Sequence, residues 1–354
     1  MTKSARPTMR DVAGLAGVSL KSVSRVVNGD EPVTEALRAR VIEAAKQLNY
    51  RPNVAANLRG RPGRPTIIGL LIQDVSNEFS ASVFRAVEDV AIARKVQVLA
   101  TNVDEDPERE RQMVAALVAR RVDGLIVVPA GADEAHLELE QRLGTPVVFA
   151  DRPPSRLQAD AVVSDNREGS RRGVRHLAAH GHRRIAFLGE SNRLAPACQR
   201  FDGYVEALVE LGVAVDERLV RRDLETEAAA REATIELLVD HRSPTAIFSA
   251  HNRLTIGAVR GLRDLGRHHE IALVGFDDFA LADLLDPPVT VVAQDPGTIG
   301  RLAAELLFQR IEGNPAPPAE HVVPTTLISR GTGELPCQEE GPQTIPTVAP
   351  TVGL

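Results

Sequence analysis

Apolar positions follow two different patterns along the chain. In the first 50 residues they recur at intervals of three and four, which is the spacing of helices with one buried face. From Thr66 onward, short apolar runs alternate with helical patterns. The first pattern predicts a small all-helical domain, and the second predicts an α/β domain with parallel sheets.

Three short helices are predicted in the first 50 residues. Thr8 and Asp11 resemble a capping box that opens the first helix, and Gly17 can end it because glycine adopts positive φ easily. Ser19 and Thr34 are typical N-caps for the second and third helices. The apolar positions of these two helices are Val23, Val26, Val27, Leu37, Val41, Ala44, Ala45 and Leu48. Because only Gly17 to Ser19 separate the first two helices, we expect a helix-turn-helix, a motif whose second helix can lie in a DNA major groove.

The longer part of the chain repeats a scheme of strands and helices in two series. The predicted strands are 67–72, 96–100, 124–128 and 147–150 in the first series and 185–188, 246–248 and 273–276 in the second. An amphipathic helix follows or precedes each of them. This order predicts two lobes, each built on a doubly wound parallel sheet with its ligand site outside the carboxyl ends of the strands.

Charge divides the chain at the same point as the apolar pattern. Residues 1–65 hold 12 Lys and Arg against 5 Asp and Glu, whereas the remainder holds 30 against 43, for a net charge of −6. A basic head indicates a nucleic-acid partner, because Lys and Arg release counterions from phosphates. The alternative is a basic face that is merely solvated.

The rest of the composition excludes several classes of protein. With 43% hydrophobic and 25% charged residues, the chain is globular rather than disordered or fibrous. It has no apolar run of about 18 residues that could span a membrane, and its polar, basic start lacks the apolar segment of a signal peptide. Two cysteines, Cys198 and Cys337, fit a reducing compartment. We therefore expect a cytoplasmic protein without membrane partners.

No motif in the chain predicts catalysis. The sequence lacks a Gly-rich phosphate loop, a zinc-protease motif and a nucleophile elbow, so we expect neither an enzyme nor a bound cofactor. His176 and His180 stand at i, i+4 with His182 close by, which is a spacing that metal sites use. Nothing else in that stretch favours a metal, and no metal site is predicted.

The helix signals of the head resemble those of the bacterial LacI/GalR-type repressors. The resemblance is carried by Asp11-Val12-Ala13, Ala16-Gly17-Val18-Ser19, Val23-Ser24-Arg25-Val26, Asn28 and Leu48-Asn49-Tyr50-Arg51-Pro52-Asn53. It extends from about residue 8 to 332 and implies a two-lobed, periplasmic-binding-protein-like body with crossovers near Val163, Ala293 and Pro324. It also implies a homodimer that binds a palindromic operator in double-stranded DNA and is controlled by a small-molecule effector.

Four segments are predicted from these patterns and this resemblance. Residues 1–50 form the helix-turn-helix head, 51–65 a hinge helix and linker, 66–332 the effector-binding and dimerisation body, and 333–354 a disordered tail. Within the body, lobe one comprises about 66–163 and 295–323, and lobe two comprises about 164–294 and 324–332.

The resemblance places operator contacts in the head and the hinge. By resemblance, base reading falls on Leu20, Lys21 and Arg25, and the full set of predicted contacts comprises Thr8, Ser19, Leu20, Lys21, Ser22, Ser24, Arg25, Asn28, Tyr50, Asn53 and Leu58. Arg25 and Lys21 can donate to guanine O6 and N7, while Leu20 can contact a thymine methyl group. The small polar residues at the helix ends suit phosphate contacts, and capping alone is the alternative role for them.

Residues 52–58 resemble the family's hinge helix, in which a leucine wedges into the minor groove. Pro52 suits the first helical position, and Leu58 would unstack a base step and kink the DNA. Members of the family usually place this leucine seven residues after the proline, whereas the separation here is six. That difference turns the side chain by about 100°. The alternative is that Leu58 packs against the body.

The resemblance also implies a set of effector-binding residues, and most of them follow predicted strands. It implies Phe79, Asp151, Arg200, Asn252, Asp277 and Gln294, and Gln73 joins the set because it follows the first predicted strand. Short carboxylates, amides and an arginine fork suit the vicinal hydroxyls of a sugar. A helix cap at Asp277 and a surface ion pair at Arg200 are the alternatives. Arg253 stands where the family commonly has Asp, which permits an anionic effector unless its side chain points to solvent.

The most consistent interpretation is a dimeric, effector-controlled transcriptional repressor whose effector is a sugar or a related metabolite. One alternative is a regulator whose co-regulator is a protein rather than a metabolite. A more distant alternative is a periplasmic-type sugar-binding receptor, which the body alone would permit but the basic head disfavours.

Overall fold

The computed structural model describes residues 9–28, 33–48, 66–131, 133–239 and 243–337. The chain divides into two compact units between Thr66 and Ile67. We call residues 9–28 and 33–48 of the first unit the head, and the described residues of the second unit, which begin at Ile67 and end at Cys337, the body. In neither part is there a helix that combines the length and the apolar character needed to cross a membrane.

The head contains the three predicted helices, α1 (Met9–Ala16), α2 (Leu20–Asn28) and α3 (Glu35–Gln47). Gly17, at φ 61°, ends α1 in the left-handed conformation that glycine adopts without a steric penalty. Ser19 caps α2, because its Oγ accepts from the backbone N of Ser22 at 3.1 Å. The buried apolar core joins all three helices and comprises Val12, Ala13, Ala16, Val23, Val41 and Ala44.

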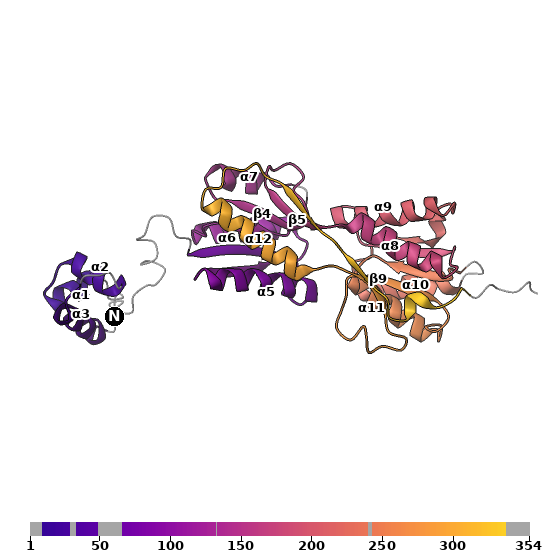
Figure 1. Ribbon diagram of the computed structural model, residues 1–354, viewed down its shortest axis with the longest axis horizontal. Helices are drawn as coiled ribbons and strands as arrows, with labels where there is room; N and C mark the ends of the chain where they lie inside the picture. Colours follow the sequence, from indigo (N-terminus) through magenta and orange to yellow (C-terminus); the bar gives the residue numbers. More distant parts are fainter. Residues whose placement is uncertain (1–8, 29–32, 49–65, 132, 240–242, 338–354) are drawn as a thin grey trace, which may run out of the picture. The chain divides into compact units, whose positions relative to one another are not determined.

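The body contains two six-stranded sheets, one in each lobe (Figure 1). In lobe one the strand order is β11 (Glu320–Val323), β5 (Asp160–Ser164), β4 (Val147–Asp151), β3 (Leu125–Val127), β1 (Ile67–Ile72) and β2 (Gln97–Asn102). In lobe two it is β12 (Thr326–Ile328), β10 (Thr290–Ala293), β9 (Ala272–Phe276), β8 (Ala246–Ser249), β6 (Ile185–Leu188) and β7 (Val220–Arg221). All neighbouring strands are parallel except β10 and β12, which are antiparallel. The predicted fold class is therefore confirmed.

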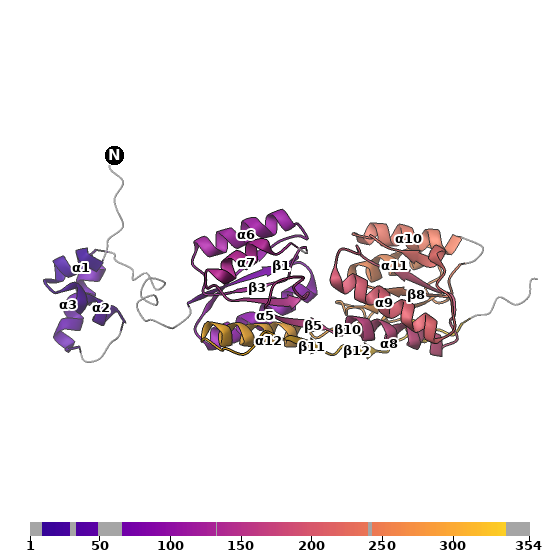
Figure 2. The ribbon, with the colours of Figure 1, turned by 90° about the horizontal axis from the view of Figure 1, so that it is seen from above.

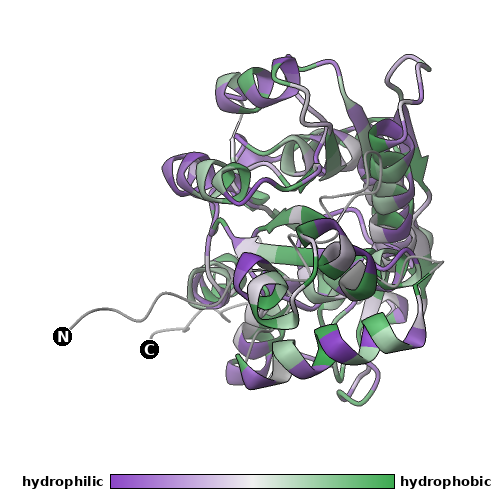
Figure 3. Cartoon of the chain, turned by 90° about the vertical axis from the view of Figure 1, so that its left-hand side faces the viewer, coloured by the Kyte–Doolittle hydropathy of each residue, from purple (hydrophilic) through white to green (hydrophobic). Residues whose placement is uncertain are grey.

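Helices cover both faces of each sheet (Figure 2). In lobe one they are α5 (Glu78–Ala93) and α12 (Pro296–Ile311) on one face and α6 (Pro107–Ala119) and α7 (Ala135–Arg142) on the other. In lobe two they are α8 (Asn166–Ala179) and α9 (Ala195–Glu210) on one face and α10 (Glu227–Val239) and α11 (Asn252–Asp264) on the other. The helices alternate between hydrophilic and hydrophobic colours, as expected of elements with one buried side (Figure 3).

Burial on both faces explains why the strands read as continuous apolar runs. In β1, Leu70 belongs to the core under α5 and α12, whereas Leu71 belongs to the core under α6 and α7. Successive strand residues point to opposite faces of a sheet, so a strand covered on both faces needs apolar residues at every position.

The chain passes between the lobes three times. It leaves lobe one after β5, returns between β10 and α12, and leaves again between β11 and β12. Figure 1 shows the last segment, drawn in yellow, running alongside both lobes. Each lobe is therefore built from segments that are distant in sequence.

The prediction of a disordered tail from residue 333 is wrong for the first five residues of that segment. A 3₁₀-helix, η2 (Thr332–Glu334), packs on lobe two, and Thr332 and Gly333 are buried. Glu334 Oε1 lies 2.6 Å from His176 Nε2, and Leu335 O lies 2.9 Å from His182 Nε2. The Pro- and Glu-rich composition of this segment did not predict these contacts, because they depend on histidines of α8 and of the turn that follows it. Residues 338–354 lie outside the described part of the chain.

Candidate functional site

The predicted base-reading residues lie on an exposed surface of α2. Leu20 is 45% exposed, although it is a large apolar residue, and Lys21 and Arg25 are also exposed. Val23 on the opposite side of the helix is fully buried. The core therefore holds α2 in place while the side chains that can read base edges face outward.

The other predicted operator contacts divide into two groups. Ser19 is exposed at the start of α2, and Ser22 and Ser24 are half-buried within it. Asn28 is the last residue of α2, and its side chain is not described. Thr8, Tyr50, Asn53 and Leu58 lie outside the described residues. Their roles, including the Leu58 wedge, stay predictions.

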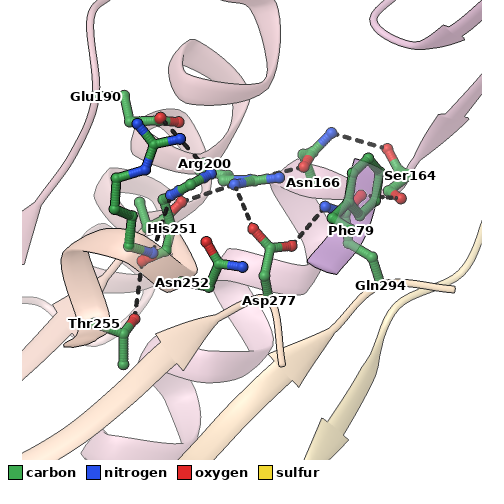
Figure 4. Close-up of polar contacts among 12 residues, drawn as sticks. Phe79, Ser164, Asn166, Glu190, Arg200, His251, Asn252, Thr255, Asp277 and Gln294 are labelled. Atoms are coloured by element: carbon green, nitrogen blue, oxygen red, sulfur yellow. Dashed lines mark hydrogen bonds and ion pairs between the residues drawn. The ribbon is translucent and has the colours of Figure 1, made fainter. Parts of the chain in front are cut away.

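A pocket lies between the two lobes of the body, and six of the seven predicted effector residues line it. Its lining comprises Gln73, Asn77, Phe79, Asp151, Arg152, Glu190, Leu194, Pro196, Arg200, His251, Asp277 and Gln294. The seventh predicted residue, Asn252, is buried beside it and accepts a hydrogen bond from Asn77 Nδ2 at 3.3 Å. Figure 4 shows how several of these side chains converge.

Two pocket aspartates stand at strand ends in an uncommon backbone conformation. Asp151 is the last residue of β4 and has φ 66°, and Asp277 follows β9 and has φ 69°. Both are about nine-tenths buried or more. Non-glycine residues rarely adopt positive φ, and such residues gather at functional sites.

Arg200 organises the lobe-two side of the pocket. Its side chain is 3% exposed, and its guanidinium lies over the Phe276 ring with Cζ 3.9 Å from the centroid. Nε donates to Asn166 Oδ1 at 2.8 Å, and Nη1 donates to Ala250 O at 2.8 Å. Nη1 is also 3.5 Å from Asp277 Oδ2 (Figure 4). The guanidinium charge is thus paired inside the protein.

A chain of hydrogen bonds continues from Asp277 to the segments that cross between the lobes. Gln294 Nε2 donates to Asp277 Oδ1 at 2.5 Å, and Gln294 Oε1 accepts from Ser164 Oγ at 2.5 Å. Ser164 ends β5, and Gln294 follows β10. A ligand that contacts Asp277 therefore acts on groups that are bonded to two of the three crossovers.

The lobe-one side of the pocket contains a second arginine and a buried acid. Arg152 makes a bidentate ion pair with Glu105, at 2.7 and 2.8 Å, and also donates to Pro129 O at 2.8 Å. Burial raises the pKa of Asp151 to about 6, although Arg152 and Arg200 oppose the rise. Gln73 adds a buried Nε2 donor without a hydrogen-bond partner among the described residues.

Direct contacts join the lobes beside the pocket. Glu78, at the start of α5, accepts from the backbone N of Ala280 in lobe two at 2.8 Å. The hydrogen bond between Asn77 and Asn252 also starts from this end of α5, because Asn77 is the N-cap of that helix. Polar groups of the two lobes therefore bond to each other directly beside the pocket.

Position 253 does not belong to the pocket lining. Arg253 Nη1 donates to Glu225 O at 3.4 Å, and its charge contributes to lowering the pKa of Asp74 in lobe one. Hydrogen bonds from Ser76 are the main cause of that lowering. Arg253 thus lies outside the pocket lining, close enough to an acid of lobe one to influence its pKa.

Six lining residues were not predicted from the sequence, namely Asn77, Arg152, Glu190, Leu194, Pro196 and His251. Three of them could have been found, because Arg152, Glu190 and His251 come directly or two residues after the strands β4, β6 and β8. The carboxyl ends of parallel strands meet at the site edge of a sheet. Leu194 and Pro196 lie at the start of α9, and no pattern marked them.

Comparisons with known proteins assign the chain to a family. Residues 8–53 match the model of the bacterial regulatory proteins of the lacI family, and residues 174–332 match a periplasmic binding protein-like domain. GalR of Escherichia coli is 32% identical over 94% of this chain and 97% of its own length. CelR of Thermobifida fusca is 34% identical over 94% of this chain and 100% of its own length. The chain belongs to the LacI family of DNA-binding transcriptional regulators.

Solved structures agree with this assignment. The CelR–cellobiose complex is 31% identical, covers 92% of this chain and all of its own, and superposes with a TM-score of 0.70. The Lac repressor dimer bound to operator and an anti-inducer is 26% identical, covers 93% of this chain and 99% of its own, and reaches a TM-score of 0.80.

Proposed function

We propose that this chain represses transcription by binding a palindromic operator as a homodimer, and that a small polyol changes its affinity for that operator. The observation that carries the proposal is the pocket between the lobes, whose polar lining comes from both lobes and is bonded to the crossover segments. A ligand in such a position can bias the relative arrangement of the lobes.

The DNA half of the proposal is supported by the exposed face of α2. Leu20, Lys21 and Arg25 combine one apolar contact with two cationic donors, which is the set needed to read a short stretch of major groove. One such helix reads only a half-site, so a dimer with two-fold symmetry is expected to read an inverted repeat. Because its target is chromosomal, we place the protein in the cytoplasm.

The effector half is supported by the kinds of polar group in the pocket. Asp151 offers acceptors, and Gln73 offers a buried donor, so a ligand must supply donors and acceptors together. Hydroxyl groups do both. Phe79 adds an apolar surface to the lining, against which a sugar ring can pack. The CelR complex with cellobiose shows such a ligand in a relative of this chain.

Footprinting of the full-length protein on DNA selected from random sequence tests the DNA half. We expect protection of an inverted repeat. The logarithm of the binding constant should fall with the logarithm of the salt concentration, with a slope of about −0.9 for each phosphate neutralised. Protection of one asymmetric half-site at stoichiometric protein would contradict the dimer. Gel shifts on the selected DNA with added monosaccharides and disaccharides then test the effector half, and we expect at least one sugar to change operator affinity.

A further inference from the structure

The charges that line the pocket do not cancel. Three carboxylates line it, those of Asp151, Glu190 and Asp277, together with the guanidinium groups of Arg152 and Arg200. Each guanidinium already has an acidic partner. Arg200 is paired with Asp277, and Arg152 is paired with Glu105, which is not itself part of the lining. Both cations are therefore neutralised, and two acids remain.

The first remaining acid is Asp151. It is 6% exposed, and its carboxylate accepts no hydrogen bond from the residues that the structure describes. Arg152 Nε lies 3.7 Å from Asp151 Oδ2, which is too long for a hydrogen bond, and this nitrogen also has no partner among the described residues. Asp151 lines the pocket, so its carboxylate oxygens are available to a donor on a ligand.

The second remaining acid is Glu190, on the lobe-two side. Its carboxylate lies 3.8 Å from His251 Nε2, again beyond hydrogen-bond distance. In Figure 4 these two side chains lie on the opposite side of Arg200 from Gln294. The imidazole offsets Glu190 only when it is protonated. Arg253 forms no ion pair with Glu190 among the described residues, and its Nη1 donates to Glu225 O at 3.4 Å.

We infer that the effector is a polyol that carries a basic amine, such as an amino sugar. This inference rests on the proposed function, since it names the ligand class for the same pocket. An ammonium group supplies three donors and a positive charge, which matches open acceptors on two acids. A carboxylate or phosphate on the ligand would face this acidic excess without an unpaired cation to bind it. The anionic effector that Arg253 had suggested is thereby disfavoured.

Isothermal titration calorimetry with the full-length protein at neutral pH tests the inference with matched probes. The probes are three sets of sugars that differ in one substituent: glucose, glucosamine and glucuronate, with the corresponding galactose and mannose sets. In at least one set we expect the amino sugar to bind about tenfold more tightly than the hydroxyl sugar, and the uronate to bind least tightly. The preference should weaken as salt is added.

Two variants assign the preference to the pocket. Glu190→Gln keeps the shape of the side chain and removes its charge, so the ratio of amino-sugar to hydroxyl-sugar affinity should fall severalfold. Glu312→Gln changes the net charge equally at an exposed position at the end of α12, and the ratio should stay at its wild-type value. Circular dichroism of both variants checks that the fold is intact.

Every other outcome overturns the inference. These outcomes are tighter binding of a hydroxyl sugar or a uronate, equal binding within each set, an unchanged ratio in Glu190→Gln, or no binding by any amino sugar. Tight binding of a neutral sugar that changes operator affinity would leave the proposed function standing while removing the amine. Failure of the wild-type protein to protect any inverted repeat would instead contradict the proposed function.

Discussion

The exposed face of α2 and the pocket between the lobes present their polar side chains in opposite ways. Lys21 and Arg25 extend from a helix whose position depends on Val23 and the rest of the head core. Arg200 and Asp277 are buried, and each is held by other pocket residues. Replacing an exposed residue of α2 should therefore affect DNA binding alone, whereas replacing a residue of the pocket should change stability as well as ligand binding.

The largest effect is expected from Arg200→Ala. The substitution leaves Asp277 buried without its cation and leaves Asn166 Oδ1 and Ala250 O without their donor. Removal of one partner of a buried ion pair costs about 3 to 5 kcal/mol. We expect a loss of this size in the free energy of unfolding of the body, together with loss of the effector response.

Denaturant unfolding followed by tyrosine fluorescence measures this effect. Tyr204 is buried in lobe two, the chain has no tryptophan, and its only other tyrosine is Tyr50. A Tyr50→Phe background thus gives a reporter for lobe two alone. The control is Arg260→Ala. Arg260 forms an exposed ion pair with Glu227, so its loss should lower the free energy of unfolding by less than about 1 kcal/mol. Equal unfolding midpoints for Arg200→Ala and Arg260→Ala would show that the buried pocket arginine contributes no more to stability than an exposed one.

The elements with strong local signals could be predicted from the sequence. The caps and apolar stripes of the head predicted all three helices, and apolar runs predicted the strands β1, β2, β3, β4, β6, β8 and β9. The strand-end rule, together with the family resemblance, selected residues that the fold brings together, such as Asp151 and Asp277. These features depend on the local pattern of residues or on the topology of parallel sheets.

Features that depend on distant contacts could not be predicted in this way. Two of the four residues of the edge strand β11 are exposed, and β12 has only three residues, so neither has a clear apolar pattern. The pairing of Arg152 with Glu105 joins two loops of lobe one that are 47 residues apart. Residues 333–337 pack against histidines of lobe two that are more than 150 residues earlier.

A smaller effect, specific to the pocket, is expected from Asp151→Asn. The pKa of Asp151 is about 6 in the folded protein, whereas the ordinary value for an aspartate is 3.8. The folded protein therefore holds this proton more tightly than the unfolded chain does. The free energy of unfolding of the wild-type protein should then fall as pH rises from about 4 to 6, and above that range it should be lower by roughly 3 kcal/mol. Asparagine does not ionise and tolerates positive φ, so the variant should gain stability relative to wild type over the same range.

Asp278 supplies a control of opposite sign. Burial opposes ionisation there, but hydrogen bonds from Arg330 and the Phe279 backbone outweigh it and lower the pKa. Asp278→Asn should therefore lose stability relative to wild type as pH rises from the acid side through about 4. Unfolding midpoints of both variants at a series of pH values give the comparison. A difference between Asp151→Asn and wild type that is the same at every pH would show that ionisation of Asp151 is not the cause.

The smallest effect, and the only one confined to the head, is expected from Arg25→Ala. Loss of a donor pair to guanine should weaken binding to the selected operator by about 1 to 3 kcal/mol and relax preference at one base in each half-site. Stability should not change, because the side chain is exposed and contributes nothing to the core of the head. Arg25→Lys retains the charge without the planar fork, so it should keep binding to scrambled DNA while losing much of the specificity. Competition gel shifts with operator and scrambled DNA at one salt concentration separate the two contributions. Equal losses on both DNAs for Arg25→Ala would mean that Arg25 contacts a phosphate, and base reading would then fall to Lys21 and Leu20.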